Sequence, residues 1–186
     1  MKQEIEKSLK ILQKKEILLY PTDTVWGIGC DATSEAAVSK IYTIKQRAES
    51  KSLIILVDEI EMLQQYIPTI SKEIIALLSK TTNPTTIIYN NPIGLAKNVV
   101  AQDNTVAIRI VQNDFCKQLI AAFGKPIVST SANISGNETP KSFKEIASPI
   151  LESVDYVVNL HREERNEKSS TILKVAENGE IIVLRA

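Results

Sequence analysis

The sequence is poor in the residues that many enzymes and metal proteins use for their chemistry. It has one histidine, His161, and two cysteines, Cys30 and Cys116. The cysteines lie far apart and lack metal-site spacing, so we expect reduced thiols in a cytosolic protein rather than a zinc site or a disulfide. A transition-metal centre or a Ser-His-Asp triad would have to use His161, which stands in the charged run "HREERNEK". We therefore predict a solvated loop at 161–168 and no metal ligand.

Long apolar runs and a net charge are also absent. No apolar run reaches the ~18 residues that a membrane-spanning helix needs, and the charged N-terminus is unlike a secretory signal. We expect no membrane association and a cytoplasmic location. The 22 Lys and Arg residues balance 22 Asp and Glu residues. This balance argues against a globally cationic nucleic-acid binder, so an anionic ligand would have to be held by a local cluster.

Several common catalytic motifs are missing. The segment "VSTSAN" lacks the G-x-S-x-G nucleophile elbow, and no G-x-x-x-x-G-K-[ST] phosphate-binding loop occurs. The "GIG" at 27–29 lacks the third glycine of a dinucleotide fingerprint. Acyl-enzyme hydrolases and P-loop proteins are therefore not expected.

What is present is an alternation of helical and extended segments that predicts one α/β domain over 1–186 with a large mixed sheet. Asn113 and Gly124 are typical caps of a helix between them, and Ser142-x-x-Glu145 resembles a capping box. Helices are expected at 3–15, 35–44, 59–66, 71–80 and 114–123, and briefly after Ser142. Strands are expected at 16–20, 52–57, 84–90, 105–110, 126–130, 154–160, 170–175 and 180–186. The segments 21–33 and 91–104 are expected to be loops.

Small polar residues follow two of the expected strands. Thr22 and Thr24 stand two apart after the first, and Ser131 and Asn133 stand two apart in "IVSTSANISG". Residues two apart in extended chain face the same way, so each pair would present its polar groups together. Turn formation explains both segments equally well.

Basic residues gather at two further places. Lys45, Arg47 and Lys51 lie within seven residues, which suits a phosphate clamp or an ordinary helix C-terminus. Arg109 interrupts the apolar strand "TVAIRI", either facing solvent or holding a carboxylate. Together these segments favour a ligand site, because open α/β sheets bind ligands at strand ends.

Five segments, in this order, resemble the YrdC/Sua5 family of threonylcarbamoyl-AMP synthases: "YPTDTVWGIGCDA", "IKQRAESK", "TVAIRI", "VSTSANISG" and "SSTIL…VLRA". The resemblance runs from about residue 15 to the C-terminus. It implies a single YrdC-like domain of the short family form. The implied fold is α/β, a twisted mixed sheet flanked by helices, with a positively charged concave cavity.

The resemblance implies a nucleotidyltransferase that joins L-threonine, bicarbonate or CO2, and ATP with Mg2+ into threonylcarbamoyl-AMP and pyrophosphate. The product would serve the t6A modification at position 37 of tRNAs, through downstream enzymes that transfer the threonylcarbamoyl group. One alternative is a double-stranded RNA or tRNA-binding module without catalysis. Another is a carbamoyl-adenylating domain like that of hydrogenase-maturation proteins.

Site residues follow from the same resemblance. The implied threonine contacts are Thr24, Arg109, Ser131 and Ser170. The implied ATP contacts are Arg47, Lys51, Thr105, Asn133 and Arg185. Lys45 and Arg47 form the basic signature taken as catalytic.

The sequence departs from the family pattern in places. Leu56 stands where some relatives carry a histidine near the threonine, and Lys141 stands where many carry a serine or threonine near the phosphates. "NEK" replaces the glycines that often precede the S-S-T segment, which leaves both Ser169 and Ser170 open as the threonine contact.

Overall fold

A computed structural model describes residues 1–48, 52–176 and 180–186. The helices are α1 Lys2–Gln13, α2 Glu35–Lys45, α3 Ile60–Tyr66, α4 Lys72–Lys80, α5 Asp114–Phe123 and α6 Ser148–Ser153, with short 3-10 turns η1 Lys97–Val99 and η2 Phe143–Glu145. The strands are β1 Leu18–Tyr20, β2 Gly27–Gly29, β3 Ile54–Val57, β4 Thr85–Asn90, β5 Thr105–Ile110, β6 Ile127–Ser131, β7 Tyr156–Val157, β8 Thr171–Val175 and β9 Ile181–Arg185.

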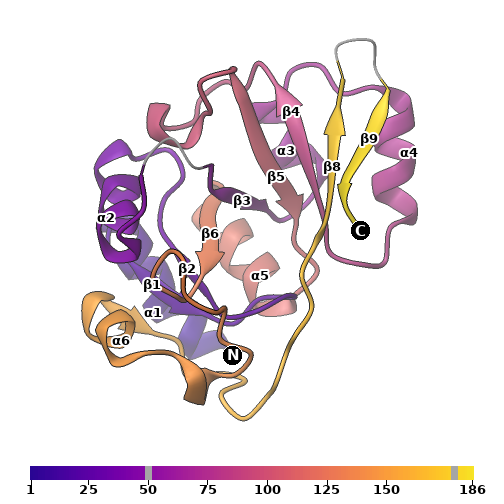
Figure 1. Ribbon diagram of the computed structural model, residues 1–186. Helices are drawn as coiled ribbons and strands as arrows, with labels where there is room; N and C mark the ends of the chain where they lie inside the picture. Colours follow the sequence, from indigo (N-terminus) through magenta and orange to yellow (C-terminus); the bar gives the residue numbers. More distant parts are fainter. Residues whose placement is uncertain (49–51, 177–179) are drawn as a thin grey trace.

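The strands join into one mixed sheet, as predicted, in the order β7-β1-β2-β6-β3-β5-β4-β8-β9. The pairs β1–β7, β3–β5 and β4–β8 are parallel and the others antiparallel. The segment that leads to β8 rises from the end of the molecule near α6 (Figure 1), and β8 then pairs between β4 and the edge strand β9. Strands distant in sequence, such as β3 and β6, are therefore neighbours in the middle of this strand order.

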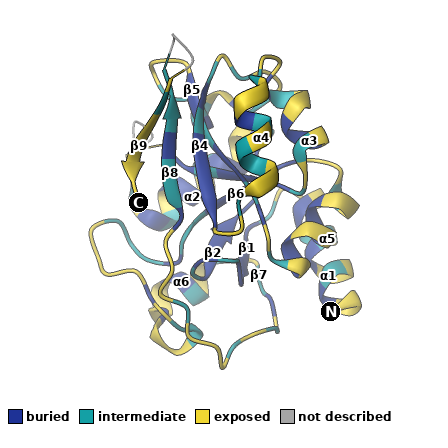
Figure 2. Ribbon diagram, turned by 90° about the vertical axis from the view of Figure 1, so that its right-hand side faces the viewer, coloured by how far each residue is buried: buried dark blue, intermediate teal, exposed yellow. Residues whose placement is uncertain are grey.

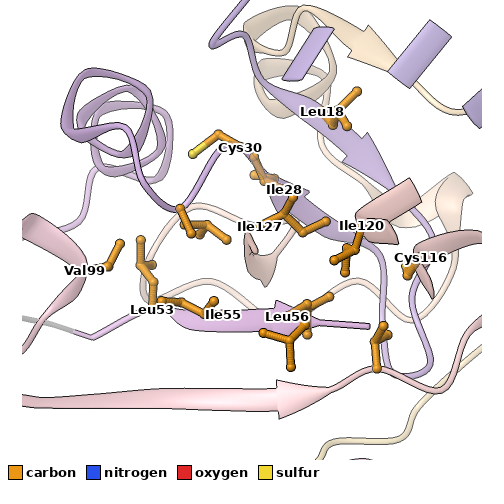
Figure 3. Close-up of a cluster of buried hydrophobic side chains, with 14 of the residues drawn as sticks. Leu18, Ile28, Cys30, Leu53, Ile55, Leu56, Val99, Cys116, Ile120 and Ile127 are labelled. Atoms are coloured by element: carbon orange, nitrogen blue, oxygen red, sulfur yellow. The ribbon is translucent and has the colours of Figure 1, made fainter. Parts of the chain in front are cut away.

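Apolar side chains of the central strands form the core, and Figure 3 shows part of it. Ile28, Leu56 and Ile127 from β2, β3 and β6 are fully buried, as is Ile120 from α5. Each such side chain contributes about 1.5–3 kcal/mol relative to an exposed one. This packing fixes the strands in place and so positions the polar groups at their ends.

Helices cover the sheet, with α1, α3, α4 and α5 along one side and their outer faces exposed (Figure 2). The predicted caps of α5 are confirmed: the Asn113 side chain accepts from the backbone NH of Cys116, and Gly124 has a positive φ of 69°. Within the described ranges, no helix has the length and apolarity to cross a membrane.

The strand β2 lies inside a segment predicted to be a loop. Glycine is unusual within strands, but here close approach requires it. A Cβ on Gly29 would lie 2.3 Å from the carbonyl oxygen of Val128 and 2.6 Å from the ring of Tyr20. The glycines therefore let β2 pack between β1 and β6 and bring the preceding loop to the cavity described below.

Two local predictions are wrong. Ser142 makes no capping hydrogen bond, and the Glu145 carboxylate instead accepts from the backbone NH of Lys141 and from Arg165. Only a 3-10 turn forms at 143–145, and α6 begins at Ser148. The strand predicted at 154–160 is also too long, because β7 has only two residues.

Candidate functional site

A cavity of about 380 Å³ opens over the ends of β2, β3, β5 and β6, bounded by the segment before β8 and by β9. Six of the residues predicted for the site line it. They are Thr24, Arg47, Arg109, Ser131, Ser170 and Arg185. The fold thus brings together side chains from six separate segments.

Arg109 lines the cavity and is 3% exposed. Its Nη2 donates to Asp23 Oδ1 at 3.0 Å and lies 3.4 Å from Thr24 Oγ1. Its buried Nε has no hydrogen-bond partner among the described residues. Thr24 Oγ1 also shares a hydrogen bond of 3.0 Å with Thr22 Oγ1, which confirms that the two hydroxyls lie together. This corner offers hydroxyl groups beside a guanidinium, a set suited to an amino acid's carboxylate and polar atoms.

Sequence reasoning missed Asp23, which holds this corner together. Its second oxygen, Oδ2, accepts from the backbone NH of Gln112 at 3.1 Å. In the sequence, Asp23 stands in "PTDT" and is typical of a turn. The charge of Arg109 within an apolar strand was the only signal that a carboxylate had to lie nearby.

Ser131 ends β6, and its hydroxyl donates to Asn133 Oδ1 at 2.5 Å. The two side chains therefore lie together, as their spacing predicted. Behind them is Lys45, whose Nζ donates to the carbonyl oxygens of Ser131 at 2.5 Å and Asn133 at 2.7 Å. Burial, helped by the charge of Arg47, lowers the pKa of Lys45 to about 8.

Lys45 and Arg47 do not share a face, as extended chain would have required. Lys45 is the last residue of α2, and Gln46 follows with a positive φ of 49°. This turn directs the two cations apart, so Arg47 lines the cavity while Lys45 is buried. Arg47 Nη2 donates to the carbonyl oxygen of Ser52 at 2.8 Å. The predicted ATP contact Lys51 lies outside the described residues.

Ser170 and Arg185 also line the cavity. Ser170 is 2% exposed, and its hydroxyl accepts from Thr86 Oγ1 at 2.8 Å. Arg185 Nη2 donates to the carbonyl oxygen of Ser170 at 2.8 Å. Ser169 also lines the cavity, so both serines of the S-S-T segment lie at the site.

Two predicted ATP contacts are not among the described lining residues. Thr105 begins β5, and its hydroxyl donates to Asp103 Oδ1 at 2.7 Å. It stands four residues from Arg109, roughly 13 Å along an extended strand. Asn133 lies just behind the wall, and its Nδ2 donates to the carbonyl oxygen of Asn137.

A cluster of charges forms the outer rim. Lys141 Nζ lies 3.3 Å from Glu167 Oε2, and both residues line the cavity. Arg165 donates to the same carboxylate, which, with Lys141, lowers the pKa of Glu167. The cationic lining residues are Arg47, Arg109, Lys141, Lys168 and Arg185.

His161 lies away from this cavity, where its Nδ1 contacts Glu164 Oε1 at 2.6 Å. Across the described part of the chain, no three His, Cys, Asp or Glu side chains gather as a metal site would require. The polar side chains that line the cavity are guanidinium, ammonium and hydroxyl groups and the carboxylate of Glu167.

Comparison with known proteins identifies the family of this chain. A model of the Sua5/YciO/YrdC family, described as telomere recombination, matches residues 10–186. The chain belongs to this family. It is 36% identical over 146 residues to a threonylcarbamoyl-AMP synthase of Psychromonas ingrahamii, covering 77% of this chain and 76% of that protein. It is 34% identical over 180 residues to one of Pseudoalteromonas translucida, covering 95% of both.

Solved structures of this family share the fold. Sua5 of P. abyssi complexed with L-threonine has a TM-score of 0.86 and 25% identity, over 97% of this chain and 53% of that chain. This chain thus spans about half the length of that Sua5. E. coli YciO has a TM-score of 0.86 and 21% identity, over 100% of this chain and 89% of its own. The family and the YrdC-like fold predicted from the sequence are confirmed.

Proposed function

We propose that the chain is an L-threonylcarbamoyladenylate synthase, a nucleotidyltransferase that uses L-threonine, bicarbonate or CO2, and ATP. The observation that carries this proposal is a single cavity lined by Arg109, Thr24 and Ser131 together with Arg47 and Arg185. The curated relatives of this name, similar over most of their length, support it. The Sua5 relative complexed with L-threonine supports the amino-acid substrate.

The threonine would bind at the corner around Arg109. In this arrangement the guanidinium takes the substrate carboxylate, and the hydroxyls of Thr24 and Ser131 bond the remaining polar atoms. Arg109 Nε, buried and without a protein partner among the described residues, is a donor that a ligand carboxylate would satisfy. Ser170 lies between this corner and Arg185, so it would contact the amino acid near the reacting end.

ATP would occupy the part of the cavity lined by Arg47 and Arg185, with Lys51 and Asn133 as further contacts. These two arginines suit a triphosphate because each guanidinium can donate a pair of hydrogen bonds to phosphate oxygens. We therefore propose that the cavity has a positive potential. ATP would enter with Mg2+, and the scarcity of lining carboxylates fits an ion held mainly by phosphates and water.

The reaction needs no protein nucleophile. The threonine amine adds to CO2 and loses a proton, giving a carbamate. A carbamate oxygen then attacks the α-phosphorus of ATP as the bond to the bridging oxygen breaks, and pyrophosphate leaves. Such transfers depend on positioning and charge neutralisation, which Arg47, Arg109 and Arg185 would supply. His161, distant from the cavity, has no role in this scheme.

The product would pass to enzymes that transfer threonylcarbamoyl to position 37 of tRNA, in the cytoplasm. Both cysteines are buried free thiols, in keeping with that location. The RNA-binding alternative is less favoured, because formal net charge is +0 and phosphate affinity would rest on a small rim.

Incubation with ATP, Mg2+, bicarbonate and single amino acids tests the proposal. Pyrophosphate release that requires both threonine and bicarbonate, with a threonylcarbamoyl-AMP adduct in the mass spectrum, is the expected result. A protein that binds RNA but releases no pyrophosphate would instead support the RNA-binding alternative.

A further inference from the structure

Lys45 is a lysine almost without solvent contact, 1% exposed at the end of α2. Its Nζ lies within hydrogen-bond distance of three oxygens. These are the carbonyl oxygens of Ser131 and Asn133, at 2.5 and 2.7 Å, and Asn133 Oδ1 at 3.4 Å. The carbonyl oxygen of Lys45 in turn accepts from the backbone NH of Ser135 at 2.8 Å. One residue thus holds segment 131–135 at three points along its length.

These contacts leave the ammonium group no donor for a substrate. An ammonium has three hydrogens, and three oxygens already surround it. Lys45 is also absent from the described residues that line the cavity, whereas Arg47 lines it. For Lys45 to contact a nucleotide directly, its Nζ would have to break its hydrogen bonds to the carbonyl oxygens of Ser131 and Asn133.

We propose that Lys45 is a positioning residue that fixes segment 131–135, and with it the place of Ser131 in the cavity wall and of Asn133 behind it. What that segment binds rests on the proposed function, whereas its attachment to Lys45 rests on the geometry alone. The two residues of the basic signature therefore have different roles. Arg47 contacts the ligand, and Lys45 sets the shape of the wall that carries Ser131.

A buried ammonium is costly unless it is fully hydrogen-bonded. The same oxygens would lack a donor if the ammonium were removed, so the segment would rearrange to reach water. Ser131 Oγ and Asn133 Oδ1 are 2.5 Å apart, and any shift of the segment moves both. A buried charge at this position thus favours one arrangement of the loop over others.

Lys45→Met, which keeps the side-chain length and removes the charge, tests the proposal. Lys40→Met is the matched control, because Lys40 is an exposed lysine on the same helix. Hydrogen exchange is measured by mass spectrometry on peptides that cover 131–137. The KM values for threonine and ATP and the kcat are measured by pyrophosphate release.

In Lys45→Met we expect exchange across 131–137 to accelerate roughly tenfold, both KM values to rise about tenfold and kcat to fall less. Lys40→Met should match the wild type in every measurement. If Lys45→Met does not fold, Lys45→Gln, whose amide donates two hydrogen bonds, replaces it.

Two results would overturn the proposal. Unchanged exchange with lost activity would mean that Lys45 acts on the substrate directly. Faster exchange with unchanged KM values would mean that the segment does not bind substrate. A wild-type protein inactive with threonine would refute the proposed function, while the exchange data would still test whether Lys45 holds the segment.

Discussion

Asp23 and Arg109, 86 residues apart in sequence, form a buried ion pair of 3.0 Å, and Arg109 lines the cavity. Their side chains are 8% and 3% exposed. Asp23 holds one Nη of the guanidinium from behind and is itself held by the backbone NH of Gln112. The pair explains how an apolar strand carries an arginine, and it fixes the orientation of the guanidinium.

The first prediction concerns this pair. Asp23→Asn keeps the size of the side chain but weakens a charge-assisted hydrogen bond, worth about 1.5–3 kcal/mol. We expect the KM for threonine to rise roughly tenfold or more, with the affinity for ATP nearly unchanged. Pyrophosphate release against threonine concentration measures the first quantity, and equilibrium titration with ATP the second.

The control for this variant is Asp114→Asn in the first turn of α5, away from the cavity. It should leave both quantities unchanged. An Asp23→Asn protein that folds normally and keeps the wild-type KM for threonine would show that Asp23 does not orient Arg109.

Much of the fold followed from local patterns in the sequence. Apolar periodicity predicted the long helices and the central strands, and the caps Asn113 and Gly124 fixed the ends of α5. Errors arose where a distant contact overrides a local preference. Gly27 and Gly29 favour a loop on their own, but they form β2 by pairing with β1 and β6. At Gly29, Val128 and Tyr20 leave no room for a side chain.

The candidate site was predictable to the extent that it lies at strand ends. Thr24, Arg109 and Ser131 follow from this rule, and all three line the cavity. Asp23 was missed because its partner is 86 residues away. The prediction that Lys45 and Arg47 share a face was also wrong. The chain turns between them at Gln46, whose positive φ is not evident from the sequence.

A second prediction concerns Arg47, a cation of the cavity wall. Arg47→Ala removes a guanidinium that would hold ATP phosphates, and a charged hydrogen bond contributes about 1.5–3 kcal/mol. We expect ATP affinity to weaken roughly tenfold or more and the fold to persist. Trp26 is the only tryptophan of the chain and lines the cavity, so its fluorescence can follow the titration. Unchanged affinity would remove Arg47 from the ATP site, and Lys40→Ala is the control.

A third prediction follows from the pKa of Lys45, lowered by burial from 10.5 to about 8. Between these two values the unfolded chain holds a proton that the folded chain has lost. The contribution of this group to the free energy of unfolding therefore rises with pH in that window, by at most about 1.4 kcal/mol per pH unit. Arg47 is the charge that adds to the effect of burial.

Urea denaturation of the wild type and of Lys45→Met, across the window from about pH 8 to 10.5, measures this difference. As pH rises, the free energy of unfolding of the wild type should increase relative to that of the variant. Parallel pH dependence of the two proteins would mean that Lys45 keeps its ordinary pKa in the folded state.

The last prediction concerns selectivity among amino acids and tests the corner formed by Arg109, Thr24 and Ser131. If these groups bind the carboxylate and the side-chain hydroxyl, valine is the decisive competitor. It has nearly the shape of threonine but leaves a buried polar partner without a hydrogen bond, at about 1–3 kcal/mol for each such group. Serine keeps the hydroxyl and lacks only a methyl group, also worth about 1–3 kcal/mol in an apolar pocket.

We expect the rate of pyrophosphate release to be highest with threonine, low with serine and lowest with valine, because a site that reads a hydroxyl rejects its isostere strongly. The three rates are measured at equal amino-acid concentration below the KM for threonine. Thr24→Val, which keeps the shape of the side chain and removes its hydroxyl, should narrow the gap between threonine and valine. Valine that reacts as fast as threonine in the wild type would mean that the hydroxyl is not recognised, and the assignment of this corner to threonine would fail.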